Sequence, residues 1–84
     1  MPPVKIYTTP YCPYCHAAKG LLDEKGVSFT EIDVTGDHEE RARLAQVTGQ
    51  RTVPQIFIGE ESIGGYDELS ALERAGRLDP LLQG

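Results

Sequence analysis

The feature that most constrains the fold is a change of hydrophobic period on either side of the tetrapeptide Cys12-Pro13-Tyr14-Cys15. Apolar and polar residues alternate from Val4 to Thr8, which is typical of a strand, and Pro10 ends that alternation. From Pro13 the apolar residues recur at helical spacing. The sequence therefore predicts that both cysteines lie in the first turn of a helix that follows a strand.

Two cysteines in one helical turn share a face, with Cβ atoms about 5–6 Å apart, so they can form a disulfide. Cys12 is at the helix N-terminus, where unpaired N–H groups and the positive end of the dipole stabilise an anion. We therefore expect Cys12 to be the thiolate nucleophile and Cys15 its inner partner. Structural zinc normally needs four ligands, and His16 and His38 are the only further Cys or His donors in the chain, at no zinc-finger spacing. The pattern thus favours redox chemistry over half a zinc site or two incidental thiols, and we expect no bound metal.

Composition narrows the class of protein. The chain has 84 residues, which suits one domain over residues 1–84. Thirteen acidic and eight basic residues give a net charge of −5, so we expect no binding to nucleic acid or to an anionic membrane. No apolar run has membrane-spanning length and no basic stretch precedes an apolar region at the N-terminus. We expect a cytoplasmic monomer, and in that reducing compartment paired cysteines favour catalysis over a structural bridge.

The first half of the chain predicts a strand–helix–strand unit. The helix ends near Gly26, and a β-branched and aromatic run from Val27 to Val34 predicts the second strand. Strands joined in this way are parallel and the crossover is right-handed. The expected core residues are Ala17, Ala18, Leu21 and Leu22 of the helix and Phe29 and Ile32 of the strand.

The second half predicts a helix, a hairpin and a last helix. Asp37 and Glu40 have the spacing of a capping box, and Gly49 closes the helix that follows. The expected apolar side of this helix is Ala42, Leu44, Ala45 and Val47. The sequence predicts an antiparallel pair of strands at Gln55 to Ile58 and Glu61 to Ile63. Asp67 is expected to cap a helix that ends at Gly76. An apolar tail that contains Leu78, Leu81 and Leu82 is expected to pack on the rest of the domain.

This layout, a βαβ unit followed by a helix, a β-hairpin and a C-terminal helix, is that of a thioredoxin fold with a four-stranded mixed sheet. From Val4 to Leu82 the sequence resembles the glutaredoxin family, of the small bacterial dithiol type. The resemblance is carried by Cys12-Pro13-Tyr14-Cys15, Thr52-Val53-Pro54 and Gly64-Gly65-Tyr66-Asp67, each at the family's usual separation.

The resemblance implies a glutathione-dependent thiol–disulfide oxidoreductase. Cys12 alone would reduce glutathionyl mixed disulfides, and Cys12 with the resolving Cys15 would reduce protein disulfides. Glutathione would be the reducing co-substrate, with no bound cofactor. The implied partners are glutathione and glutathionylated or disulfide-containing proteins, with ribonucleotide reductase as one candidate.

The resemblance also implies a glutathione groove formed by Tyr14, Thr52, Val53, Pro54, Gly65, Tyr66 and Asp67. Pro54 would be cis, which turns the Val53 backbone toward the cysteine of glutathione, and the backbone at Gly65 with Asp67 would hold the γ-glutamyl end. Arg41 is either a contact for the glycine carboxylate or part of a solvated helix face.

Two positions depart from the family pattern. Tyr66 replaces a residue that is usually small, and its ring either crowds the ligand or stacks beside it. Thr9 replaces a lysine that many members use near the thiolate; Lys19 is expected to be a surface charge, and Arg51 either compensates or is solvated. Because of these departures, we retain an alternative function, that of an electron donor which a thioredoxin-type flavoprotein reductase reduces. A glutathione-ligated iron–sulfur carrier ranks lower, because the inner cysteine and the motif proline are both present.

Overall fold

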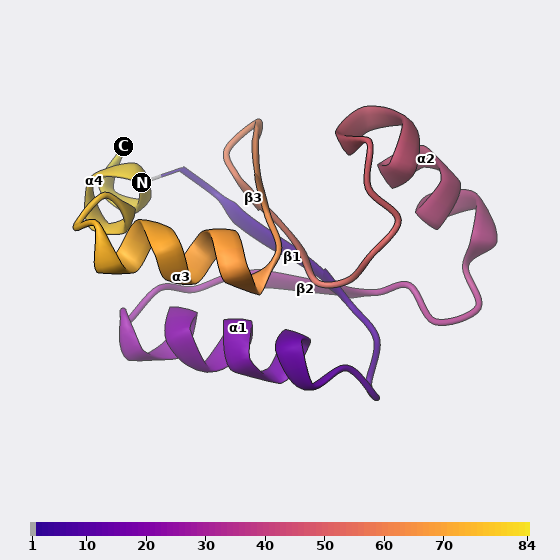
Figure 1. Cartoon of the computed structure of the whole chain (residues 1–84), viewed down its shortest axis with the longest axis horizontal. Coiled ribbons are helices and arrows are strands. Elements are labelled where there is room, and N and C mark those ends of the chain that lie inside the picture. Colours follow the sequence, from indigo (N-terminus) through magenta and orange to yellow (C-terminus); the bar gives the residue numbers. More distant parts are fainter. Residues whose placement is uncertain (1) are drawn as a thin grey trace.

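The computed structural model describes residues 2–84 and is organised around its first strand, β1 (Figure 1). Strand β1 pairs in parallel with β2 and antiparallel with β3, and β3 pairs antiparallel with β4. The sheet order is β2-β1-β3-β4, so the predicted four-stranded mixed sheet of a thioredoxin fold is confirmed. The elements are β1 (Val4–Thr8), α1 (Pro13–Glu24), β2 (Thr30–Asp33), α2 (His38–Thr48), β3 (Gln55–Ile58), β4 (Glu61–Gly64), α3 (Tyr66–Arg74) and α4 (Leu78–Gln83).

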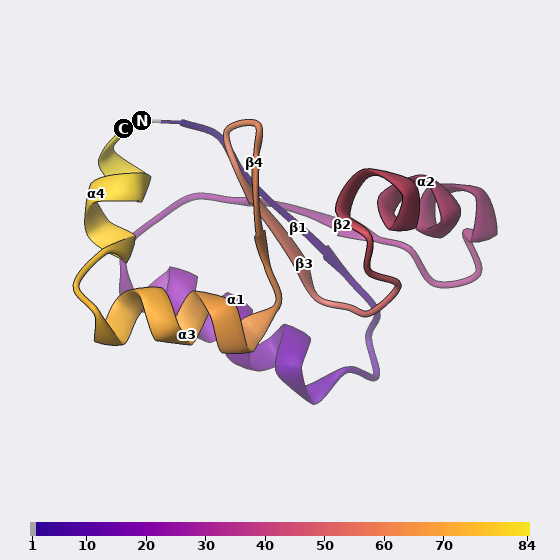
Figure 2. The same ribbon diagram turned by 45° about the horizontal axis from the view of Figure 1, so that its top comes forward.

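The two faces of the sheet carry separate apolar clusters, because neighbouring residues of a strand point to opposite faces. On one face, buried residues of β1 and β3 pack against α1, α3 and α4; this larger cluster is Val4, Ile6, Ala18, Leu22, Ile56, Ile58, Leu69, Leu78 and Leu82. On the other face, Tyr7 packs with Val34 and with Leu44 of α2. Figure 2 shows α1 and α3 side by side below the sheet, with α2 apart from them.

Strand β2 is shorter than predicted, because it begins at Thr30 and not at Val27. The Val27 N–H still donates to the Leu22 carbonyl at 3.2 Å, so this residue completes the end of α1 and is unavailable to the sheet. Phe29 and Ile32 are half-buried rather than fully buried, and Val34, just after the strand, is fully buried instead.

The predicted apolar faces of the first two helices were too wide. Ala17 is exposed, and the buried face of α1 consists of Cys15, Ala18 and Leu22. Of the expected apolar side of α2 only Leu44 is buried; Ala42 and Val47 are exposed and Ala45 is half-buried. The reason in α2 is that this helix reaches the sheet through the small second cluster alone.

The C-terminal part differs from the prediction in two details. Gly65, not Asp67, is the residue that precedes α3, and Asp67 lies inside the first helical turn. The expected tail is a short helix, α4, which buries Leu78 and Leu82 in the larger cluster. Lys25, at the end of α1, forms ion pairs with Glu73 at 2.6 Å and Asp79 at 3.1 Å, so charges also join α1 to α3 and α4.

Candidate active site

Cys12 is the last residue of the loop before α1, and the first turn of that helix fixes its position. Its backbone is extended (φ −100°, ψ 109°), and Pro13 occupies the first helical position, as predicted. The Cys12 sulfur accepts a hydrogen bond from the Cys15 backbone N–H at 3.1 Å. This N–H is one of those that a helix start leaves unpaired, so the positive end of the helix dipole faces the sulfur.

Cys15 occupies a different environment, although both cysteines are free thiols in this structure. Its side chain is fully buried on the sheet-facing side of α1, whereas Cys12 is partly exposed. Burial, together with the hydrogen bond to Cys12, raises the pKa of the Cys15 thiol from 9.0 to about 12. Cys15 is therefore a neutral thiol at physiological pH, and Cys12 is the sulfur that a solute can reach.

The loop before β3 brings the backbone of Val53 to Cys12. The Val53–Pro54 peptide bond is cis, as the resemblance implied. The Cys12 thiol donates to the Val53 carbonyl, with the sulfur and oxygen 3.5 Å apart. The side-chain amide of Gln55 donates to the Gln50 carbonyl at 2.7 Å and so ties the start of the loop to the strand that follows it.

A groove of about 310 Å³ begins beside these residues and runs to the N-terminus of α3. All the residues predicted for the glutathione groove line it except Arg41. The lining residues are Tyr14, Gln50, Thr52, Val53, Pro54, Gly65, Tyr66, Asp67 and Glu68. The structure therefore brings together segments from α1, the loop before β3 and the start of α3.

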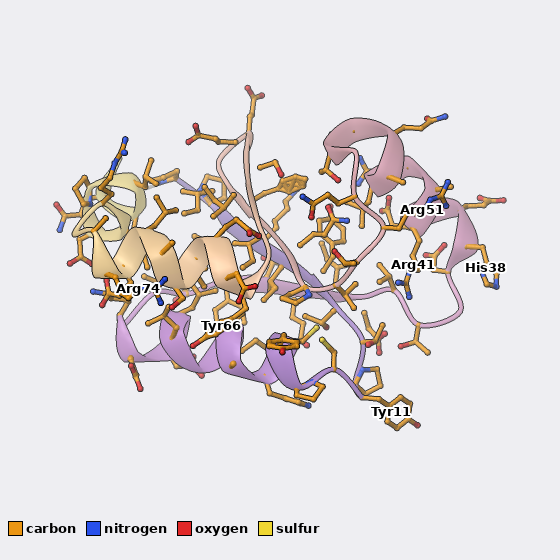
Figure 3. All side chains as sticks on the ribbon, viewed as in Figure 1. Tyr11, His38, Arg41, Arg51, Tyr66 and Arg74 are labelled. Carbon is orange, nitrogen blue, oxygen red and sulfur yellow. The ribbon has the colours of Figure 1, made fainter. Side chains whose placement is uncertain are left out.

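Tyr66 forms one wall of this groove together with Tyr14. The ring centroids are 6.4 Å apart and the planes are tilted by 32°, so the two rings lie beside each other. Figure 3 shows Tyr66 between α3 and α1, whereas Tyr11 points away from the body of the protein. The departure at position 66 thus extends the aromatic wall and leaves the groove open.

The N-terminus of α3 presents both a carboxylate and free backbone donors to the groove. The Gly65 N–H donates to the Glu68 carboxylate at 2.6 Å. The Asp67 side chain is exposed in the first turn of α3, where backbone N–H groups have no helical acceptor. This helix end can therefore bind a group that carries one negative and one positive charge. The backbone N–H groups would bind its anion, and the Asp67 carboxylate would bind its cation.

Arg41 lies outside the groove lining and contacts the loop that leads to the groove. Its guanidinium donates to the Arg51 carbonyl at 3.1 Å, and the side chain is partly buried. Figure 3 shows Arg41 and Arg51 near each other beside α2. Arg51 itself is exposed. The Arg41 guanidinium therefore contacts the residue that directly precedes Thr52, which lines the groove.

Lys19 is not the free surface charge that periodicity predicted. Its ammonium is 2.9 Å from the Glu31 carboxylate, and its side chain is 24% exposed. Thr9, in the position where the family often has lysine, accepts a long hydrogen bond of 3.4 Å from the Cys12 N–H through its carbonyl.

Sequence reasoning missed Gln50 and Glu68, which also line the groove. Glu68 had a signal, because it stands three residues after Gly65, the spacing of a carboxylate that caps a helix start. Gln50 had none, since its place depends on how the loop folds back onto β3.

The comparisons with known proteins agree with this geometry. The family model described as Glutaredoxin matches residues 4–63. A glutaredoxin of Pseudomonas aeruginosa is 62% identical over 82 residues, which cover 98% of each chain. Glutaredoxin 3 of Escherichia coli is 52% identical over 80 residues, or 95% of this chain and 96% of that one.

Similarity to solved structures extends over the same residues. A buckwheat glutaredoxin–glutathione complex superposes with a TM-score of 0.91 at 38% identity, covering 98% of this chain and 77% of that chain. Within residues 2–84, no three His, Cys, Asp or Glu side chains are grouped to hold a metal ion. In the same part of the chain, no helix is both long and apolar enough to cross a membrane.

Proposed function

The chain belongs to the glutaredoxin family and has its thiol–disulfide oxidoreductase role, and we propose that its reaction depends on glutathione. The observation that carries the proposal is the groove between Cys12 and the N-terminus of α3, which has about 310 Å³ for a small extended peptide. The complex of a buckwheat glutaredoxin with glutathione, a protein with the same fold, supports it.

In the proposed pose, the cysteine of glutathione pairs with the Val53 backbone, as an added strand would, and its sulfur lies beside Cys12. The closeness of the Val53 carbonyl to the Cys12 sulfur supports this assignment. The γ-glutamyl carboxylate meets the backbone N–H groups at the start of α3, and its ammonium meets Asp67. Tyr14 and Tyr66 cover one side of the peptide, and Thr52 and Pro54 line the other part of the groove.

The glycine carboxylate of glutathione requires a cation, and Arg41 is our candidate. It already donates to the Arg51 carbonyl, next to Thr52, and a guanidinium retains further N–H donors for a carboxylate. Arg51, exposed on the same loop, is the second cation within this region.

The first reaction uses Cys12 alone. Its thiolate attacks the glutathionyl sulfur of a mixed disulfide, a Cys12–glutathione disulfide forms, and the protein thiolate leaves and takes up a proton. The groove orients the glutathionyl sulfur, which makes the protein thiolate the leaving group. A second glutathione thiolate then attacks the glutathionyl sulfur, releases Cys12 and leaves as glutathione disulfide.

The second reaction needs Cys15. A protein disulfide attacked by Cys12 gives a mixed disulfide with Cys12, and Cys15 attacks the Cys12 sulfur to release the protein thiol and form the Cys12–Cys15 bridge. Since burial keeps Cys15 protonated, it does not compete with Cys12 for the incoming substrate. The proposed protein partners are glutathionylated and disulfide-containing proteins of a reducing cytoplasm, where glutathione is kept reduced.

The test is NADPH consumption with glutathione, glutathione reductase and a small glutathione mixed disulfide. We expect turnover by the wild type and by Cys15→Ser, and none by Cys12→Ser. With a protein disulfide as substrate, Cys15→Ser should lose activity while the wild type retains it. Circular dichroism of each variant controls for folding.

Two results would count against the proposal. Equal loss of both activities in Cys15→Ser would contradict the division of labour between the cysteines. A folded wild type that turns over with a thioredoxin-type flavoprotein reductase but not with glutathione would favour that reductase as the electron donor.

A further inference from the structure

A cluster of polar and charged side chains, Lys19, Glu31 and Thr8, lies on the face of the sheet that α1 covers. Lys19 follows Cys15 by four residues on α1, so their side chains lie on one helix face, with Cβ atoms about 6 Å apart. The Glu31 carboxylate of β2 is 2.9 Å from the Lys19 ammonium. The same carboxylate oxygen accepts a hydrogen bond of 2.7 Å from the hydroxyl of Thr8, a buried residue at the end of β1.

This arrangement fixes a cation near the buried thiol. Two strands hold the Lys19 ammonium through Glu31, and the Lys19 side chain is itself only 24% exposed. The Lys19–Glu31 hydrogen bond is itself exposed, so water partly screens the ammonium, but the ion pair keeps the ammonium in one place relative to Cys15. Burial is the main reason that the pKa of Cys15 is raised; a hydrogen bond with the Thr9 backbone and, to a smaller extent, the positive charge of Lys19 oppose this rise.

We propose that Lys19 is a positioning residue for the resolving step: its ammonium, held by the Glu31 carboxylate that Thr8 fixes, stabilises the negative charge that develops on the Cys15 sulfur. The inference rests on the second reaction of the proposed function, in which both cysteines take part. It assigns no part to Lys19 in the first reaction, since Cys12 lies about one helical turn farther from Lys19 than Cys15 does and is partly exposed.

The step that Lys19 assists is a balanced exchange. Cys15 loses its proton, its sulfur attacks the Cys12 sulfur of the mixed disulfide, and the Cys12–Cys15 bond forms as the bond to the substrate sulfur breaks. The leaving thiolate accepts a proton from solvent, so the protein is oxidised by two electrons and the substrate is reduced by two. Negative charge is on the Cys15 sulfur only between the loss of its proton and the formation of the new bond.

The ion pair at the other end of α1 provides a matched control. Lys25 also pairs with carboxylates, those of Glu73 and Asp79, but it lies at the far end of the helix from the cysteines. Lys25→Met therefore removes the same charge and a comparable ion pair without changing the surroundings of Cys15.

The experiment is stopped-flow reaction of the reduced protein with dithiobis(nitrobenzoate), which needs no glutathione. Attack by Cys12 releases a first nitrothiobenzoate, and attack by Cys15 on the resulting mixed disulfide releases a second. We expect Lys19→Met to slow the second release about three- to tenfold, the effect of removing one partly screened charge from the surroundings of Cys15. The first release should change by less than about twofold.

The controls separate charge from packing. Lys25→Met should leave both releases at the wild-type rate, and Lys19→Arg should restore the second release because it keeps the charge. Lys19→Gln replaces Lys19→Met if the latter does not fold. A second release unchanged in the neutral variant, or slowed equally by Lys19→Arg, would overturn the proposal. Because the reagent takes the place of the disulfide substrate and a single turnover needs no reductant, this result is independent of whether glutathione is the reductant.

Discussion

Cys12 and Cys15 are three residues apart but have different surroundings, and this difference underlies the chemistry of the pair. The Cys12 sulfur faces the start of α1 and the Val53 carbonyl at the surface. The Cys15 sulfur is enclosed between α1 and the sheet. In the proposed function, the sulfur that substrate can reach is the nucleophile, and the enclosed thiol reacts only after Cys12 has formed a mixed disulfide.

Tyr66 is the groove residue at which this chain departs from the family pattern. Its ring lies beside that of Tyr14, 6.4 Å away, and the groove stays open beneath them. We expect Tyr66→Ala to raise the KM for glutathione about three- to tenfold with little change in kcat, because the peptide loses one aromatic contact. Initial rates over a range of glutathione concentrations measure this effect.

The matched variant Tyr66→Phe keeps the ring and should retain the wild-type KM. A lower KM in Tyr66→Ala would mean that the ring crowds the ligand instead of covering it.

Helix α2 shows how an element can be well defined and yet weakly attached. Its start is capped by Asp37, whose carboxylate accepts from the Glu40 N–H at 3.1 Å, and its end is the left-handed Gly49 (φ 76°). Between these ends only Leu44 is buried. The helix therefore depends on its termini more than α1 does, in which Cys15, Ala18 and Leu22 are buried.

We expect Asp37→Ala to reduce the free energy of unfolding by about 1 kcal/mol and to speed hydrogen exchange in α2 more than in α1. Asp37→Asn keeps a side-chain acceptor and should stay close to the wild type. Urea unfolding gives the first quantity and amide exchange gives the second. Uniform exchange across both helices would contradict a local role for the cap.

The sequence predicted the positions of the secondary structure better than the depth of burial. Local rules place Pro13 at the start of α1, Asp37 at the cap of α2 and Gly49 at its end, since each depends on neighbours in the chain. The burial of Ala17 and Val47 was predicted wrongly, because a helical pattern says which side is apolar and not how much sheet lies opposite.

The site shows the same difference between features that sequence motifs predict and features that depend on how distant segments pack. The contact between Cys12 and Val53, 41 residues apart, followed from the motifs and their resemblance to a family. By contrast, the place of Gln50 in the groove and the pairing of Lys19 with Glu31 depend on how distant segments meet. Periodicity along one element carries no information about such pairs.

At the scale of the whole molecule, the sheet separates a large cluster under α1, α3 and α4 from a small one under α2. Cys15 is enclosed on the side of the large cluster, so its protonation is coupled to folding of the entire chain. The folded-state pKa of Cys15 lies above its unfolded value of 9.0, at about 12. Its contribution to stability is therefore complete below about pH 9 and is lost as the pH rises toward 12.

We expect the free energy of unfolding of the reduced wild type to fall with pH above about 9 more steeply than that of Cys15→Ser, by at most about 1.4 kcal/mol per pH unit. Cys12→Ser retains Cys15 and should keep the steep slope. Urea unfolding at several alkaline pH values, in the presence of a reductant that is not a thiol, gives the slopes. Equal slopes in Cys15→Ser and Cys12→Ser would show that Cys15 titrates alike in both states.

Because the Cys15 sulfur is enclosed, the number of cysteines that react with an alkylating probe reports whether the chain is folded. A bulky alkylating probe attaches to the partly exposed Cys12 of the folded protein, while Cys15, with no exposed surface, is protected. Unfolding exposes the second sulfur, so an unfolded molecule carries two probes and a folded one carries a single probe. Mass spectrometry can then count folded and unfolded molecules in a mixture without any added label site.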